Sequence, residues 1–175
     1  MQPEAKVSII GAIVMFVLQI VVAPNIALFG VVPNLLLIYS IVVAMLLPTN
    51  SSLVLAFVCG LLSDLLGFGP VGALAFLLVV AAFAASRLYA VFANGRVGTA
   101  LVTMMVFTLV VNLLYALFIL GASAALSPLD AFLYRALPCT LIECVLGLLI
   151  YPLMSHLLVG RAPTMGSATP SLRFR

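Results

Sequence analysis

The stretch Gly60-Leu-Leu-Ser-Asp-Leu-Leu-Gly-Phe-Gly-Pro-Val-Gly-Ala-Leu-Ala75 contains the feature that decides how the rest of the chain is read. An acid, Asp64, lies here inside an apolar run, and a Gly/Pro turn follows it directly. An ionisable side chain at membrane depth costs roughly 2.5–3.5 kcal/mol on insertion scales. The fold therefore has to neutralise this carboxylate, for a structural or a functional purpose.

The composition of the whole chain indicates an integral membrane protein. Its 175 residues are 66% hydrophobic and 6% charged, whereas soluble domains average about 45–50% apolar and about 25% charged residues. The apolar runs are long and continuous, which favours helices over a β-barrel with its alternating segments of about ten residues. The net charge of +3 comes from Lys and Arg residues at segment ends and in the tail, so it does not indicate nucleic-acid binding.

Six apolar runs, separated by turn residues and prolines, predict an all-α membrane protein with six transmembrane helices in one compact bundle. We expect one domain over residues 1–160, with helices over residues 7–23, 33–47, 52–66, 70–92, 97–120 and 131–159. Prolines inside the last run predict a kink there. Residues 161–175 form a basic tail with the composition of a disordered segment.

The distribution of basic residues predicts the orientation in the membrane. With both termini in the cytoplasm, Arg135 is the only basic residue on the outer side. The inner segments then hold the other six, which are Lys6, Arg87, Arg96, Arg161, Arg173 and Arg175.

Among the polar residues within or close to the predicted spans, we single out four as candidates for contacts inside the protein: Asp64, Asn112, Arg135 and Glu143. Three of them belong to stripes of residues spaced by four, which share one helix face. The first stripe consists of Ala56, Gly60 and Asp64. The second stripe consists of Arg135, Cys139, Glu143, Gly147 and Tyr151. Small residues let helices approach, and polar residues then bond across the gap. We expect both stripes to face the interior, with Asp64 either neutralised by Arg135 or hydrogen-bonded by Asn112.

These polar groups have three possible roles: structural contacts, a docking surface for a partner, or an ion or ligand pathway. The structural role is favoured, because hydrogen bonds within membranes average about 0.6 kcal/mol and occur without transport. We expect no enzyme activity, cofactor or metal. His156 stands alone at the end of the last run, the cysteines form no CxxC motif, and Gly67-Phe-Gly69 lacks the Lys of a phosphate-binding loop.

Two short motifs resemble the MreD family of bacterial rod shape-determining membrane proteins. They are Pro33-Asn34-Leu35, at the start of the second predicted helix, and Gly60-x-x-x-Asp64 followed by Gly72-Ala73-Leu74-Ala75. The resemblance covers roughly residues 5–160. It implies that the family-matching residues shape the fold or a groove facing the partner protein MreC; these are Pro33, Asn34, Gly60, Asp64 and Gly72.

The same resemblance implies a non-enzymatic scaffold in the cell-elongation machinery of the bacterial inner membrane, which organises lateral peptidoglycan synthesis. The implied partners are MreC, the actin homologue MreB, the RodA glycosyltransferase and a class B penicillin-binding transpeptidase.

A competing class is transport. Six helices in about 175 residues also resemble the substrate-binding S-components of energy-coupling-factor vitamin transporters, whose fold we expect to be similar. Those subunits bind a vitamin near the outer face, beneath ordered outer loops. The predicted outer loops are short here and poor in hydrogen-bonding side chains. We therefore predict a scaffold, with no small-molecule ligand.

Overall fold

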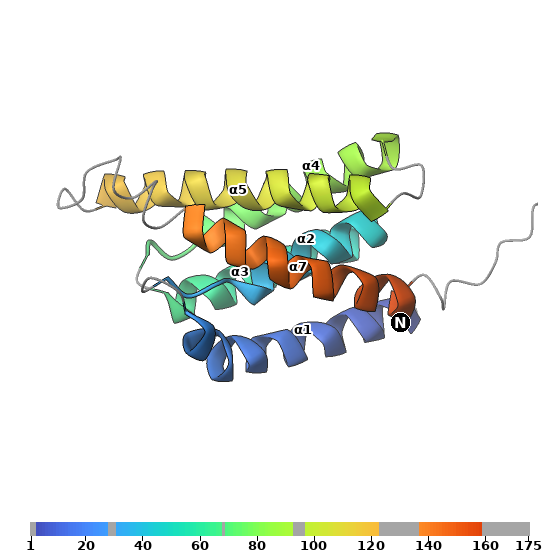
Figure 1. The fold of residues 1–175 in the computed structure, drawn as a ribbon, viewed down its shortest axis with the longest axis horizontal. Coiled ribbons are helices and arrows are strands. Elements are labelled where there is room, and N and C mark those ends of the chain that lie inside the picture. The colour runs from blue at the N-terminus through green and yellow to red at the C-terminus, as the bar shows by residue number, and fades with distance from the viewer. Residues whose placement is uncertain (1–2, 28–30, 68, 93–96, 123–136, 159–175) are drawn as a thin grey trace, which may run out of the picture.

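The computed structural model describes residues 3–27, 31–67, 69–92, 97–122 and 137–158, and in these ranges it is helical with no strand. One short 3₁₀ helix, η1 (Ala23–Ile26), follows the first α-helix. The six α-helices of the described residues are shown in Figure 1 and are α1 (Pro3–Val21), α2 (Leu35–Leu46), α3 (Asn50–Leu66), α4 (Ala73–Phe92), α5 (Val97–Ala122) and α7 (Leu137–Leu158).

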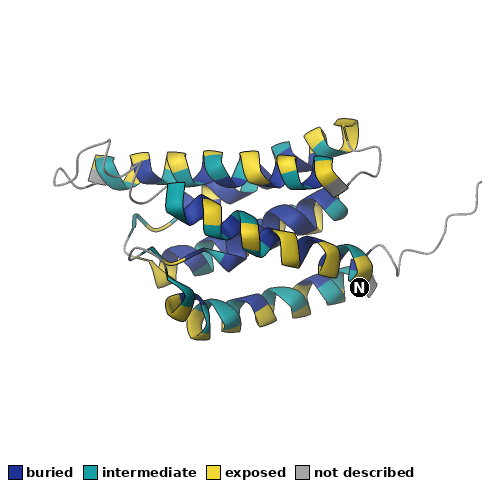
Figure 2. Cartoon of the chain, viewed as in Figure 1, coloured by how far each residue is buried: buried dark blue, intermediate teal, exposed yellow. Residues whose placement is uncertain are grey.

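Helix α2 is the core of the molecule. It packs against α1, α3, α4, α5 and α7, and every residue from Leu35 to Met45 is buried (Figure 2). A helix that is apolar on all sides is stable only when it is surrounded by other helices. Its 12 residues extend over about 18 Å at a rise of about 1.5 Å per residue. This is less than the roughly 30 Å of a bilayer core, so the helix is too short to expose both ends beyond it.

The helices around α2 present apolar side chains outward. Large hydrophobic residues on α1, α4 and α7 are more than half exposed, as Ile10, Phe76 and Leu149 illustrate, and Figure 2 shows such exposed positions along the outer helices. Four described helices, α1, α4, α5 and α7, are long and apolar enough to cross a membrane. An apolar outer surface of this kind is stable in lipid and not in water.

The start of α1 and the end of α7 lie at the same end of the molecule (Figure 1). Near this end two hydrogen bonds between helices involve tyrosines. The Tyr39 hydroxyl of α2 donates to the Ser8 carbonyl of α1 at 2.7 Å, and the hydroxyls of Tyr89 on α4 and Tyr151 on α7 lie 2.9 Å apart.

Several helices begin at residues other than those expected. Helix α1 already begins at Pro3 and not at residue 7. Helix α2 begins at Leu35, because Asn34 caps it with its side chain and stays extended. Helix α4 begins at Ala73 and not at residue 70, because Gly72 adopts a φ of 97°, outside the helical region.

The last helix is described from Leu137, which places Pro138 in its first turn, where its missing N–H leaves no bond unmade. Pro152 lies inside the helix. The expected start at residue 131 and the tail 161–175 lie outside the described residues.

Candidate functional site

The carboxylate of Asp64 binds the N-terminus of α4. Asp64 is 1% exposed, and its two oxygens accept three backbone N–H groups. Gly72 N–H bonds Oδ2 at 2.9 Å, Leu74 N–H bonds Oδ1 at 3.1 Å, and Ala75 N–H bonds Oδ2 at 3.1 Å. The first N–H groups of a helix have no partner inside it, and its dipole attracts negative charge there. Asp64 on α3 thus caps the following helix.

The glycines of the opening stretch make this cap possible. On α3, Gly60 lies one turn before Asp64, and a Cβ atom added to it would meet the Ala75 Cα at 2.5 Å. Only glycine lets the two backbones come this close. The positive φ of Gly72 turns the chain so that its N–H faces the carboxylate. We call Gly60, Asp64 and Gly72, with the amides they hold, the α3–α4 cap.

A second buried carboxylate, Glu143 on α7, binds the N-terminus of α2. Its side chain is fully buried. The Asn34 backbone N–H donates to Oε1 at 2.8 Å, the Asn112 side-chain amide on α5 donates to Oε2 at 2.6 Å, and the Cys139 thiol donates to Oε1 at 3.2 Å. The Asn112 amide also donates to the Thr140 hydroxyl at 3.0 Å. Glu143 therefore joins α2, α5 and α7.

Other side chains complete the N-terminus of α2. The Gln19 side chain on α1 accepts from Leu35 N–H at 2.7 Å and donates to the Pro33 carbonyl at 3.1 Å. The Asn34 side chain accepts from Leu37 N–H at 3.0 Å. We call Gln19, Asn34, Asn112 and Glu143 the α2 cap.

The two caps lie next to each other. The Ser63 hydroxyl, on the residue before Asp64, donates to the Asn34 side-chain oxygen at 3.2 Å. Both buried acids thus belong to one polar layer. The N-terminus of α4 binds Asp64 through three backbone amides, and the N-terminus of α2 binds Glu143 through one.

The structure corrects one expected pairing. The hydrogen bond between Asp64 and Asn112 does not form among the described residues, because Asn112 bonds Glu143 and Thr140 while Asp64 bonds backbone amides. The reason is reach: the short Asp side chain is already held against the next helix by Gly60, and the longer Glu extends towards α5. Arg135, the other expected partner of Asp64, lies outside the described residues.

The other expected positions fall mostly in the interior. The described members of both stripes are buried: Ala56, Gly60, Asp64, Cys139, Glu143, Gly147 and Tyr151. Gly147 accommodates the Met104 side chain of α5. Pro33 is buried and its carbonyl accepts the Gln19 amide.

Gln19 is the member of the α2 cap that sequence reasoning missed. The sequence did contain an indication of this role, because Gln19 is the one side-chain amide in the first apolar run and lies a few residues before that run ends.

This arrangement can bind helix termini, and it offers no catalytic geometry among the described residues. His156 is exposed at the end of α7, and no described group of three His, Cys, Asp or Glu residues could hold a metal ion. Apolar helices that share a buried polar layer define an integral membrane protein in which the intramembrane acids hold helices together.

Comparison with known proteins places this membrane protein in a family. The family model described as "rod shape-determining protein MreD" matches residues 5–160, so the chain belongs to the MreD family. This family consists of membrane proteins that determine rod shape, and it is not a known enzyme family. The expected family membership is therefore confirmed. Neither the curated proteins nor the solved structures contained a match to the chain.

Proposed function

We propose that this chain is a non-enzymatic scaffold of the bacterial rod complex, which binds MreC and helps organise lateral peptidoglycan synthesis. MreB, RodA and a class B penicillin-binding transpeptidase are its partners in the same complex. The match of the MreD family model to residues 5–160 is the observation that carries the proposal.

The use of the buried acids supports a scaffold over a transporter. A subunit that binds a vitamin needs polar groups facing a cavity. In the described chain, Asp64 and Glu143 accept bonds from backbone amides and from Asn112. Two hollows lie elsewhere, one between α1 and α7 and one among α1, α2 and α3, and none of these three residues lines either of them.

In this proposal the helices form one compact bundle with both termini in the cytoplasm, and the fold is that of the energy-coupling-factor S-components. The shared end of α1 and α7 (Figure 1) and the six basic residues of the inner segments support this orientation. The protein is then a multi-pass component of the bacterial inner membrane, with residues 1–160 as its domain and the basic tail in the cytoplasm.

Co-purification from the native membrane tests the scaffold role. The tagged chain is isolated in mild detergent, and mass spectrometry identifies both the proteins and the small molecules that accompany it. A second tagged polytopic membrane protein, purified in parallel, shows which proteins are background. We expect enrichment of MreC and of the cell-wall synthases. Enrichment of cytoplasmic ATPase subunits, or a vitamin in stoichiometric amount, would contradict the scaffold and indicate a transporter subunit.

Complementation tests the role in cell shape. Cells that lack the chain should lose their rod shape and regain it when the wild-type chain is expressed. We expect the Asp64→Ala variant to restore the shape poorly and the Gly98→Val variant to restore it fully, since a Cβ at Gly98 meets no atom within 4 Å. Normal rods in cells without the chain would refute the proposed function.

A further inference from the structure

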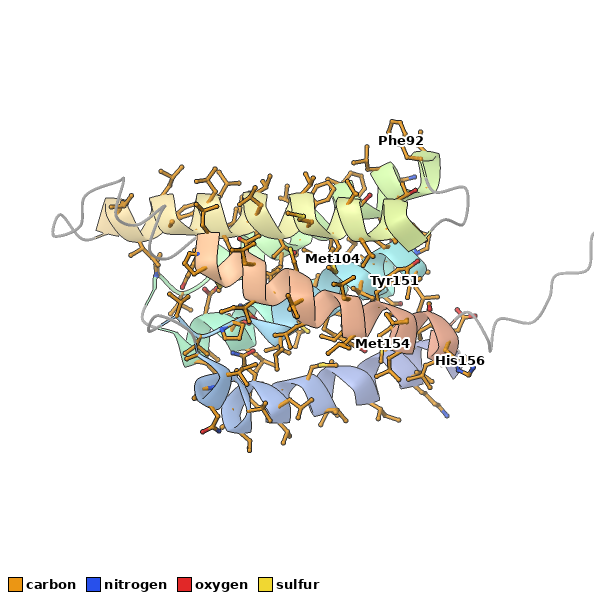
Figure 3. All side chains as sticks on the ribbon, in the orientation of Figure 1. Phe92, Met104, Tyr151, Met154 and His156 are labelled. Atoms are coloured by element: carbon orange, nitrogen blue, oxygen red, sulfur yellow. The ribbon has the colours of Figure 1, made fainter. Side chains whose placement is uncertain are left out.

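An apolar groove of about 320 Å³ lies between α1 and α7. Its walls include Val7, Ile10 and Val14 from α1 and Leu153, Met154 and Leu157 from α7. Figure 3 shows Met154 on the side of α7 that faces α1. Since Ile10, Val14 and Leu153 are about half exposed or more, the α1–α7 groove opens on the outer surface, where lipid surrounds a membrane protein.

One end of the α1–α7 groove carries exposed basic side chains. Lys6 precedes Val7 and lies one turn before Ile10 on α1. His156 precedes Leu157 at the end of α7 (Figure 3). The acid nearest in sequence, Glu4, lines the separate hollow among α1, α2 and α3. An exposed cation therefore adjoins the groove-lining residue Val7, and the described residues that line the groove include no carboxylate.

We propose that the α1–α7 groove binds one anionic phospholipid, with an acyl chain along the groove and the phosphate at Lys6. An amphipathic ligand with an apolar tail and an anionic head matches both parts of this surface. Basic residues at the membrane surface attract anionic lipids by about 1 kcal/mol per Lys or Arg.

The dimensions and lining of the groove favour a lipid over a transmembrane helix of a partner. From Val7 to Met15 the α1 wall is about 12 Å long at about 1.5 Å per residue, whereas a spanning helix extends through roughly 30 Å of hydrocarbon. Helix–helix contacts in membranes also favour small residues. The only glycine in the lining, Gly11, is taken up by Tyr39, whose hydroxyl is the first atom that a Cβ there would meet.

Native mass spectrometry of the full chain in mild detergent tests the proposal. The protein is titrated with phosphatidylglycerol or with phosphatidylethanolamine of the same acyl chains. We expect the wild type to bind phosphatidylglycerol more tightly. Lys6→Gln should weaken phosphatidylglycerol binding roughly five-fold, the factor that corresponds to one basic residue at the membrane surface. It should weaken phosphatidylethanolamine binding less, because the ammonium group of that lipid offsets the charge of its phosphate. Val14→Trp fills the groove and should weaken binding of both lipids.

Two variants on α4 are matched controls. Arg87→Gln removes an exposed cation that lies over the Phe83 ring, and Val80→Trp enlarges a side chain that is 49% exposed, as Val14 is. Both should bind lipid as the wild type does, and a thermal transition in the same detergent shows that each variant is folded.

Equal affinity of the wild type for the two lipids would overturn the proposal. Equal losses in the α4 variants, or no loss in the α1 variants, would also overturn it. If the Val14→Trp variant loses a bound partner protein but still binds lipid as the wild type does, the groove is a protein-binding site and the proposal is wrong.

Discussion

Helix α4 takes the partners of its first N–H groups from the helix just before it, whereas α2 takes them from both ends of the chain. Asp64 lies 8–11 residues from the three amides that it binds. Glu143 is 109 residues from Asn34, and Gln19 is 16 residues from Leu35. The α3–α4 cap is thus complete within one helical hairpin, and the α2 cap exists only when α1, α5 and α7 are in place.

The difference shows that two acids in one polar layer can stabilise the protein at different levels, one within a helical hairpin and the other across the whole domain. The α3–α4 cap stabilises a local structure, so its loss should weaken the α3–α4 hairpin. Through the hydrogen bond from Ser63 to Asn34 it should also disturb the α2 cap. The α2 cap connects four helices, so its loss should weaken the arrangement of the whole domain. The first three of the four predictions that follow test the two caps, and the fourth concerns a buried hydroxyl outside both of them.

Asp64→Ala should produce the largest loss of stability. Three N–H groups of α4 lose their acceptor in apolar surroundings, and each unpaired group costs about 1–3 kcal/mol, so a loss of roughly 3 kcal/mol or more is expected. Unfolding of the purified protein in mixed detergent, followed by circular dichroism, measures it. The control is Glu4→Ala, which removes a partly buried acid from the first turn of α1 and should cost about 0.5 kcal/mol. Equal losses in the two variants would refute the α3–α4 cap.

Gly60→Val should destabilise the same hairpin through its backbone. The new side chain meets Ala75 Cα and forces α3 and α4 apart, with an expected cost of about 1–3 kcal/mol. Gly98→Val introduces the same side chain into α5, where the Cβ has open space, and should stay within about 0.5 kcal/mol of the wild type. Similar unfolding curves for both variants would mean that close approach at Gly60 is unimportant.

A double-mutant cycle distinguishes the two possible partners of Asn112. Asn112→Ala combined with Glu143→Ala should show a coupling of about 0.6 kcal/mol, the average for hydrogen bonds in membranes. Asn112→Ala combined with Asp64→Ala should be additive within about 0.3–0.5 kcal/mol. The opposite pattern of couplings would restore the pairing of Asp64 with Asn112 that the sequence suggested.

Thr108→Val should change the stability in the opposite direction. The Thr108 hydroxyl is buried on α5 and has no hydrogen-bond partner among the described residues. Removing it should stabilise the protein by up to about 1 kcal/mol, since a buried unpaired polar group is costly. Thr103→Val on the same helix removes a hydroxyl that bonds the Thr99 carbonyl at 2.8 Å and should not stabilise. A gain in Thr103→Val of equal size would attribute the effect to valine in general.

The helical fold could be predicted from the sequence because a long continuous apolar run can satisfy all its backbone hydrogen bonds within a membrane by forming a helix. The importance of Asp64 was accessible as well, since it interrupts such a run. The partners of Asp64 could not be predicted in the same way, because its donors are backbone amides, which every residue except proline carries. The Gly/Pro turn directly after Asp64 was the available signal that a helix N-terminus lies within reach.

The α2 cap was harder to predict. Glu143, Asn112 and Gln19 stand on three different helices, and no spacing along the chain relates them. The second predicted helix, residues 33–47, is shorter than the roughly 20 residues of a full span. At least one end of it therefore lies within the membrane, where its unpaired backbone groups need protein partners. Sequence reasoning started this helix at Pro33, two residues before its first residue Leu35, and only the packing of α1, α5 and α7 reveals which side chains complete its N-terminus.

The long-range bond from Glu143 to Asn34 also sets an order for assembly during synthesis. The second helix leaves the ribosome long before the residue that caps it, and until α7 enters the bilayer its first N–H group lacks the acceptor it has in the finished protein. The α3–α4 hairpin has no such delay, because its acid is made before the amides it binds. The nascent chain therefore contains a second helix whose N-terminal cap is incomplete until Glu143 has been made, and a chain interrupted before Glu143 lacks this bond in the centre of the protein.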